Sequence, residues 1–231
     1  LSAAQIAQLV LTAPSEVENN EPPSTARFMS AYGGRMILAD LQNFYWSKLG
    51  LPDAFPPANA DTLDTGEGDE IRGLHEFSDD LLLIFTANNV WGIFGNDPQS
   101  WTVKAVDHSV GCANHRSITE VPGGVMWWST TVGPVIFDGE SITKVGLDKL
   151  GPDIVVNNVE GSRLTHIASG FDPQGQRSLF SYSLLNTSAR NDAIIPFNAR
   201  VMEFEATRWN PMDISALGIG YDTDDKLKLF L

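Results

Sequence analysis

The sequence has a single cysteine, Cys112, and no long apolar run. One cysteine excludes an intrachain disulfide and a metal site built from several cysteines. The longest unbroken apolar run, Leu81–Phe85, is far shorter than the ~20 residues that a membrane-spanning helix needs. The first basic residue is Arg27, so the positively charged start of a secretory signal is lacking and no such signal is predicted.

Basic residues are also scarce. The 231 residues include 15 Lys and Arg against 29 Asp and Glu, which gives a formal net charge of −14. Because basic residues drive phosphate binding by releasing counterions, this balance argues against a nucleic-acid-binding protein. Charged residues make up only 19% and apolar residues 42%, which excludes a disordered chain and a coiled coil.

Helical periodicity is rare, and short apolar stretches separated by Gly, Asn, Asp and Pro dominate. Such stretches, rich in β-branched and aromatic residues, are typical of strands that end in tight turns. The predicted strands are 27–32, 35–39, 44–47, 73–77, 81–86, 90–94, 101–106, 118–121, 125–129, 135–137, 142–145, 164–169, 179–184, 200–205 and 226–230. We therefore predict an all-β protein.

Turns and helices complete this prediction. Hairpin turns are expected at Gly33-Gly34, Asn88-Asn89, Pro122–Gly124 and Asp138-Gly139, where glycine or asparagine supplies the positive φ that such turns need. Residues 222–225 are expected to turn a further hairpin. Ser2–Leu11 fits a helix or a strand, and Asp148–Val159 fits one short helix with Pro152 near its first turn.

Tryptophan spacing favours a β-propeller. Trp46, Trp91, Trp127 and Trp209 are separated by 45, 36 and 82 residues, and the last spacing is near two periods of ~40, the length of a four-stranded blade. Residues 77–95 and 122–139 repeat one order of strand, turn, strand and glycine. We predict a β-propeller-like array of short antiparallel four-stranded blades. At ~42 residues a blade the sequence supplies about five to five and a half blades, so either the ring is small or other residues or subunits complete it.

An acidic, proline-bearing segment interrupts the pattern. We predict a lead-in at residues 1–26 and a propeller-like domain at 27–231, with a loop insertion at 51–70 in which 51–69 holds no strand. A solvated loop, an arm that docks on a basic neighbour and a Ca²⁺ loop at 64–70 are all open, although the last fits no EF-hand spacing. The candidate interface residues are Asp53, Asp61, Asp64, Glu67, Asp69 and Glu70.

The sequence shows no catalytic constellation. The four histidines form no zinc-hydrolase pair, and neither a nucleophile elbow nor a glycine-rich phosphate cradle is present. Cys112 lies near His108 and His115, but a buried apolar role is favoured over a nucleophile. We predict no catalytic, cofactor-binding or metal-binding residues and expect a protein that is not an enzyme, although the many acids leave glycoside hydrolysis open.

Several stretches together resemble the propeller proteins of tailed bacteriophages, namely the tail nozzle (tail tubular B-like) and stabilisation proteins. The resemblance covers roughly residues 22–230. The stretches that carry it are Arg27–Ala39, Phe44–Pro52, Gly68–Leu74, Leu82–Phe85, Val90-Trp91, Val110–Ser117, Gly123–Ser129, Gly133–Gly139, Val201–Phe204 and Arg208-Trp209.

This resemblance implies a structural virion protein, made in the host cytoplasm and built into the phage tail or neck. Such proteins form ring oligomers, commonly sixfold, that contact the portal, the adaptor and other tail proteins. DNA passes through the channel during genome ejection without specific binding, and a net charge of −14 would repel it from the wall.

The main alternative is a carbohydrate-binding or glycoside-cleaving β-propeller. Sugar binding needs a Trp or Tyr exposed in a concave pocket beside carboxylates, whereas the structural interpretation buries the four tryptophans named above in blades. A third alternative, an extracytoplasmic interaction propeller of a bacterium, is normally accompanied by a secretion signal.

Overall fold

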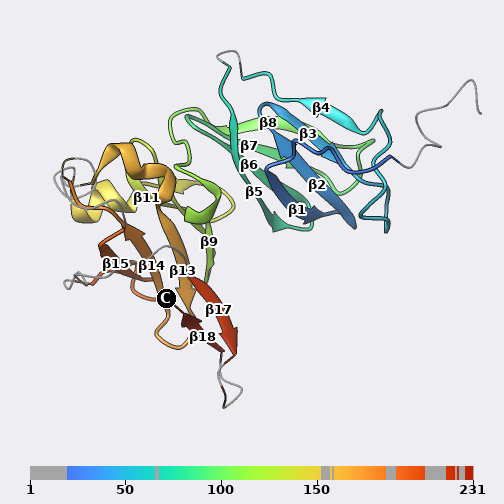
Figure 1. Cartoon of the computed structure of the whole chain (residues 1–231). Helices are drawn as coiled ribbons and strands as arrows, with labels where there is room; N and C mark the ends of the chain where they lie inside the picture. The colour runs from blue at the N-terminus through green and yellow to red at the C-terminus, as the bar shows by residue number, and fades with distance from the viewer. Residues whose placement is uncertain are drawn as a thin grey trace, which may run out of the picture. The chain divides into compact units, whose positions relative to one another are not determined.

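The computed structural model describes residues 20–65, 68–151, 157, 159–185, 191–205, 217–221, 223 and 227–230. These residues form four four-stranded antiparallel sheets and one two-stranded sheet. Within each sheet the strands are neighbours in chain order, so every sheet is a simple meander (Figure 1). The protein is an all-β, β-propeller-like array of short blades, which confirms the predicted fold class.

We number the four-stranded sheets as blades 1 to 4. Blade 1 consists of β1 (Phe28–Tyr32), β2 (Arg35–Asp40), β3 (Asn43–Trp46) and β4 (Ala60–Thr62). Blade 2 consists of β5 (Ile71–Ser78), β6 (Leu81–Thr86), β7 (Val90–Phe94) and β8 (Thr102–Asp107).

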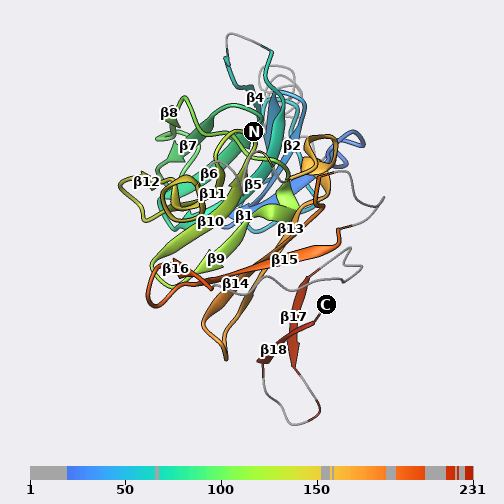
Figure 2. The ribbon, with the colours of Figure 1, turned by 90° about the vertical axis from the view of Figure 1, so that its left-hand side faces the viewer.

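The second half of the chain repeats this plan (Figure 2). Blade 3 consists of β9 (Thr119–Val121), β10 (Gly124–Ser129), β11 (Gly133–Phe137) and β12 (Ile142–Thr143). Blade 4 consists of β13 (Ala168–Asp172), β14 (Arg177–Tyr182), β15 (Ala193–Asn198) and β16 (Glu203–Phe204). β17 (Gly218–Tyr221) and β18 (Leu227–Phe230) pair as the predicted C-terminal hairpin.

The chain divides into two compact units, residues 1–84 with 92–104 and residues 85–91 with 105–231. In the first unit β1 lies beside β5, and in the second β9 lies beside β13. Contact between the first strands of successive sheets is what radial packing of blades requires. The two repeated stretches, 77–95 and 122–139, each contain the second and third strands of a blade, as their shared pattern predicts.

Blade 1 has two different faces. One face carries Tyr32, Ile37 and Phe44, all at most 1% exposed, and it packs on blade 2 within the first unit. The other, which we call the Met29 face, consists of Met29 and Ala31 on β1 with Met36, Leu38 and Tyr45 opposite or beside them. Met29 is 66% exposed, so an apolar side chain stands in solvent on this face.

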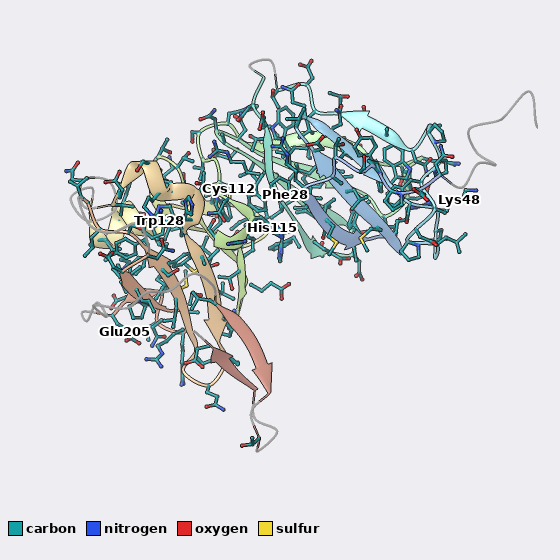
Figure 3. All side chains as sticks on the ribbon, viewed as in Figure 1. Phe28, Lys48, Cys112, His115, Trp128 and Glu205 are labelled. Carbon is teal, nitrogen blue, oxygen red and sulfur yellow. The ribbon has the colours of Figure 1, made fainter. Side chains whose placement is uncertain are left out.

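The core of the second unit lies between blades 3 and 4. Trp128 of β10, labelled in Figure 3, is 1% exposed. Its ring meets Phe180 of β14 edge to face at 5.8 Å between centroids and Tyr182 of β14 at a tilt at 5.5 Å. The preceding Trp127 points to the other side of the strand, where it contacts Phe85 at 5.0 Å and its Nε1 donates to the Gly111 carbonyl. The two neighbouring indoles therefore anchor opposite faces of one strand.

The predicted tight turns all connect paired strands. Gly33 and Gly34 join β1 to β2 with φ of 56° and 70°, and Gly123 and Gly139 also have positive φ. In the turn after β11, Asp138 accepts hydrogen bonds from the backbone N–H groups of Ser141 and Glu140. These bonds hold the pKa of the Asp138 carboxyl below its usual value.

The prediction that residues 51–69 hold no strand is wrong, because β4 lies within them. All three residues of β4 are exposed, so the segment gives no apolar signal, and it is held by pairing with β3 from Tyr45↔Ala60 to Asn43↔Thr62. The Thr62 hydroxyl adds a 2.7 Å hydrogen bond to Asn43 Oδ1.

The strand predicted at 164–169 is also wrong at its start. A 3-10 helix, Gly161–His166, occupies that region, and β13 begins only at Ala168. Glu160 caps this helix, because its Oε1 accepts from the backbone N–H of Ser162 at 3.2 Å and from the hydroxyl at 2.7 Å. Local capping therefore overrides the β-forming Leu164-Thr165 pair.

A strand was missed at β15, where Pro196 lies in the middle. The Pro196 carbonyl accepts from the backbone N–H of Glu205, so this residue directs its backbone polar groups toward β16. The absent N–H of proline therefore costs no hydrogen bond to β14, and pairing from Arg177↔Asn198 to Tyr182↔Ala193 is continuous in register.

The helix predicted within Asp148–Val159 differs in position, since a short π-helix covers Gly146–Leu150. Residues 152–156 and 158, and the segment Ser2–Leu11, lie outside the described residues. Trp127 is buried as predicted, whereas Trp46 and Trp91 are only partly buried, so the predicted burial holds in part for these two. Trp209 lies outside the described residues.

Candidate functional site

A pocket of about 450 Å³ opens in the first unit at the ends of strands of blades 1 and 2. This volume lies within the range of about 300–1,000 Å³ that is typical of small-molecule sites. A leucine and two prolines form part of its wall, and the polar and aromatic lining side chains are Arg35, Trp46, Lys48, Asn59, Asp97 and Gln99.

The turn between β1 and β2 determines how close the two blades come at this pocket. Gly33 has φ +56°, and a Cβ atom there would lie 2.6 Å from the Asn96 carbonyl oxygen. Only glycine therefore lets the β7–β8 connection approach the turn, which brings Asp97 and Gln99 to the pocket. Asp97 organises that connection, because its Oδ1 accepts from the Gln99 N–H and its carbonyl from the Ser100 N–H.

Trp46 ends β3 and is the aromatic wall of the pocket. Its ring meets Trp101 edge to face at 5.2 Å and Phe44 at 6.0 Å between centroids, and Trp101 in turn contacts Tyr32 at 6.0 Å. The Trp46 backbone N–H donates to the Asn59 carbonyl at 3.1 Å. The indole is therefore held by neighbours on both sides while it remains partly exposed.

Tyr32 links blade 1 to the end of β7 in the same region. It is 1% exposed, and its hydroxyl donates to the carbonyls of Gly95 and Ile93 at the end of β7. Burial, together with the negative charges of Asp80 and Glu76, raises the pKa of Tyr32 to about 12. The hydroxyl therefore stays protonated and keeps its donor role through the physiological range.

Positive charge enters the pocket from two side chains. Arg35 uses one terminal nitrogen to donate to the Ser47 carbonyl at 3.0 Å, while its buried Nε donates to no acceptor within the described chain. Lys48, labelled in Figure 3, follows β3 and lines the same pocket. With Asp97 as the one lining carboxylate, the charged side chains of the pocket sum to +1 in a chain of −14.

This arrangement suits recognition rather than bond cleavage. A fixed indole offers a flat apolar surface, the amides of Asn59 and Gln99 offer donors and acceptors, and Arg35 offers a charged donor. The pocket contains one carboxylate, whereas glycoside hydrolysis by the usual mechanism needs two that flank the bond.

The predicted interface acids differ in how exposed they are. Asp53, Asp61 and Asp64 are exposed, Asp69 is only 7% exposed, and Glu67 lies outside the described residues. Glu70 is exposed and lies 3.6 Å from Arg27, which also pairs with Asp40 at 3.2 Å. Little of Asp69 is therefore accessible to a partner in this conformation, and the interface role of these acids stays an untested prediction.

Cys112 and His108, named above as a possible nucleophile and base, have different neighbours. Cys112 is fully buried, and its Sγ donates to the Asn114 carbonyl at 3.2 Å and lies 3.5 Å from the Ser117 hydroxyl. His108 instead stands edge to face with Trp91. Within the described ranges no three His, Cys, Asp or Glu side chains gather as a metal site would require. No helix in the same ranges has the length and apolar character to cross a membrane.

Sequence reasoning named Trp46 only as a tryptophan buried in a blade and missed the pocket. Arg35, Asn59 and Gln99 come from three separate segments, and no local pattern joins them. The nearest sequence signal was the Gly33-Gly34 pair, which indicated a turn but not the blade that approaches it.

No protein-family profile and no curated protein sequence matches this chain. Solved structures do match it, at low identity. The chain is similar to virginiamycin B lyase from Staphylococcus aureus, a β-propeller protein, with a TM-score of 0.54 and 16% identity over 90% of this chain and 64% of the lyase.

Two larger proteins are similar at the same level. Raptor from Chaetomium thermophilum matches with a TM-score of 0.52 and 11% identity over 97% of this chain. The extracellular domain of BT4673 from B. thetaiotaomicron matches with a TM-score of 0.54 and 11% identity over 91%. The chain spans only 22% of the first and 26% of the second. At these identities the likeness shows the fold alone, a β-propeller-like array.

Proposed function

We propose that this chain is a structural protein of a tailed bacteriophage, a subunit of the tail nozzle or neck ring around the DNA exit channel. The sequence resemblance to phage propeller proteins supports the assignment, and the propeller-like fold agrees with it. The observation that carries the proposal is the Met29 face of blade 1.

In a β-propeller each blade is covered on both faces by its neighbours. Blade 1 uses one face to pack on blade 2, yet its Met29 face leaves Met29 66% exposed, with Ala31 exposed beside it. Apolar side chains on a face of this kind favour burial against another surface. We assign that surface to a second copy of this chain, because a ring of identical subunits needs one such contact per subunit.

The assembly is tested by native mass spectrometry of the purified chain and of two variants. Met29→Glu places a charge in the proposed contact, whereas Val201→Glu places the same charge at a residue that is 60% exposed in the second unit. We expect ring oligomers for the wild type and for Val201→Glu, and at least a tenfold weaker association for Met29→Glu. A wild-type chain that stays monomeric at ~100 µM would contradict the proposal.

The phage assignment needs a separate test. Gold-labelled antibodies against this chain, applied to virions from a genome that encodes it, are expected to mark the neck or tail in electron micrographs. Labelling of the capsid, or of none of the particles, would remove the assignment even if the chain forms rings.

The Trp46 pocket favours a second function, carbohydrate binding. It meets in part the condition stated for this alternative, since the partly exposed Trp46 lines the pocket beside one carboxylate, that of Asp97. A binding role of this kind is compatible with a structural subunit and is tested independently below.

A further inference from the structure

We propose that the Trp46 pocket binds an acidic saccharide, with one sugar ring against the Trp46 indole and a carboxylate of the sugar at Arg35. This inference rests on the carbohydrate-binding alternative and does not depend on ring assembly. It adds the ligand class and the residue that selects it.

The charge of the ligand follows from Arg35. Arg35 lines the pocket, and one terminal nitrogen of its guanidinium is held by the Ser47 carbonyl at 3.0 Å. A cationic donor gains most from a charged acceptor, and a guanidinium already fixed at one terminal nitrogen presents its other terminal donors in a defined plane. A carboxylate is the group that matches this geometry.

The sugar ring follows from the rest of the lining. The apolar face of a pyranose packs on an aromatic plane, and Trp46 is fixed in place by Trp101 and Phe44. Hydroxyl groups both donate and accept, so they need neighbours of both kinds. The amides of Asn59 and Gln99 and the carboxylate of Asp97 provide them around the same pocket.

Charge elsewhere on the chain adds to selectivity. With a net charge of −14, the chain as a whole repels anions, so a polyanion without a fitting ring gains little from the pocket. Shape and charge must therefore both match. An acidic peptide carries the charge but not the hydroxyl-bearing ring, and it serves as the competing ligand in the test.

The experiment is isothermal titration calorimetry of the full chain with four probes. They are digalacturonate, its dimethyl ester, neutral digalactose and a dipeptide of two glutamates. We expect digalacturonate to bind with a dissociation constant below ~1 mM, and the ester, which lacks the charges, to bind at least tenfold more weakly. Digalactose is expected to match the ester, and the peptide to show no saturable binding.

Variants locate the binding. Arg35→Gln is expected to weaken digalacturonate binding tenfold or more and to leave the weak binding of the ester unchanged. Gln99→Ala changes an exposed side chain and is expected to weaken both ligands two- to tenfold without affecting folding. Arg200→Gln, an exposed arginine of the second unit, is the matched control and is expected to bind as the wild type does.

The outcomes separate the two claims. Equal binding of digalacturonate and digalactose, or an Arg35→Gln variant that still prefers the acid, overturns the acidic-saccharide inference while carbohydrate binding survives. Saturable binding of the glutamate peptide at equal affinity shows recognition of charge alone and also overturns it. If no saccharide binds at 10 mM, both the inference and the carbohydrate-binding alternative fail, and ring assembly is unaffected.

Discussion

At the scale of single residues, Gly33 has two roles that a larger residue could not fill. Its φ of +56° lies in the left-handed region, and its missing Cβ leaves room for the Asn96 carbonyl of blade 2. Gly33 therefore lets the β1–β2 turn of blade 1 lie against the β7–β8 connection of blade 2, and the Trp46 pocket depends on this close approach.

The first prediction concerns this close approach at Gly33. Gly33→Ala is expected to destabilise the chain by about 2–4 kcal/mol, because it adds a backbone clash to the cost of a left-handed alanine. Gly50→Ala is the control, since Gly50 has φ +68° with no atom within 4 Å of a built Cβ and should cost only about 1 kcal/mol. Urea unfolding of both variants measures the difference. Equal costs would contradict the role of close approach.

Tyr32 gives the second prediction, which concerns pH. Its pKa in the folded chain is about 12, above the ordinary value of 10.0, so the folded state holds the phenol proton more tightly than the unfolded state does. The resulting stability is fully present below pH 10 and is lost as the pH rises toward 12. Allowing for solvent screening, the loss is about 1–2 kcal/mol.

Unfolding free energies at pH 9, 10 and 11.5 test this for the wild type and for Tyr32→Phe. The variant retains the ring and loses the titrating group, so its stability should fall less steeply above pH 10. If the unfolding free energies of the two proteins change with pH in the same way, the pKa of Tyr32 is not raised in the folded state.

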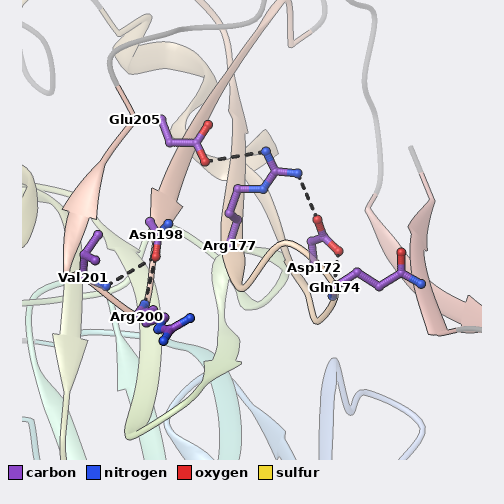
Figure 4. A network of polar contacts seen from close by, with 7 residues as sticks. All are labelled: Asp172, Gln174, Arg177, Asn198, Arg200, Val201 and Glu205. Atoms are coloured by element: carbon purple, nitrogen blue, oxygen red, sulfur yellow. Dashed lines mark hydrogen bonds and ion pairs between the residues drawn. The ribbon is translucent and has the colours of Figure 1, made fainter.

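At the scale of elements, short polar motifs hold the strands of the second unit together. Figure 4 shows one, in which Arg177 pairs with Asp172 at 3.2 Å and with Glu205 at 3.6 Å, across the strand ends of blade 4. Nearby, Asn198 Oδ1 accepts from the backbone N–H groups of Arg200 and Val201 and closes the turn into β16.

Asn114 makes a longer-range link and carries the third prediction. Its Oδ1 accepts from the Arg116 N–H, and its Nδ2 donates to the carbonyls of Leu164 and Ile167 at 3.2 and 2.9 Å. Asn114→Ala is expected to cost about 2–3 kcal/mol because it removes a donor from the carbonyl of the buried Ile167 and the acceptor that caps the helix at 115–117, whereas Asn198→Ala opens only a local turn and should cost about 1 kcal/mol. Thermal unfolding compares them, and an equal loss would contradict the link.

The elements also show what the sequence could and could not predict. β6 and β7 match their predicted bounds because each is an apolar run that ends in a turn signal. β4 was missed because a strand at the edge of a sheet needs only backbone partners, and its three residues are all exposed. β15 was missed because the effect of a proline depends on which neighbour its absent N–H would face.

The candidate site was less accessible to prediction. Trp46 was recognised as an aromatic of blade 1, yet its role depends on Asp97 and Gln99, about 50 residues further along the chain. The packing of blade 1 on blade 2 brings these residues together. Periodicity and composition describe single strands and do not predict how two blades pack.

At the scale of the whole molecule, net charge opposes the approach of one copy to another. Every copy carries −14, so copies repel one another as they approach, and salt screens that repulsion. The fourth prediction is that the proposed oligomer is favoured at 0.5 M NaCl over 0.02 M NaCl, by at least fivefold in the apparent association constant. Analytical ultracentrifugation at both salt concentrations measures it, and stronger association at low salt would indicate contacts made by opposite charges instead.

Cys112 is the one thiol of the sequence, and it lies fully buried in the second unit. A thiol-specific dye can reach the Cys112 thiol only when the surrounding packing opens. The rate of labelling therefore reports how often the packing opens. The second unit thus carries its own reporter of opening, and any ligand or partner that stabilises this unit should lower the rate of Cys112 labelling.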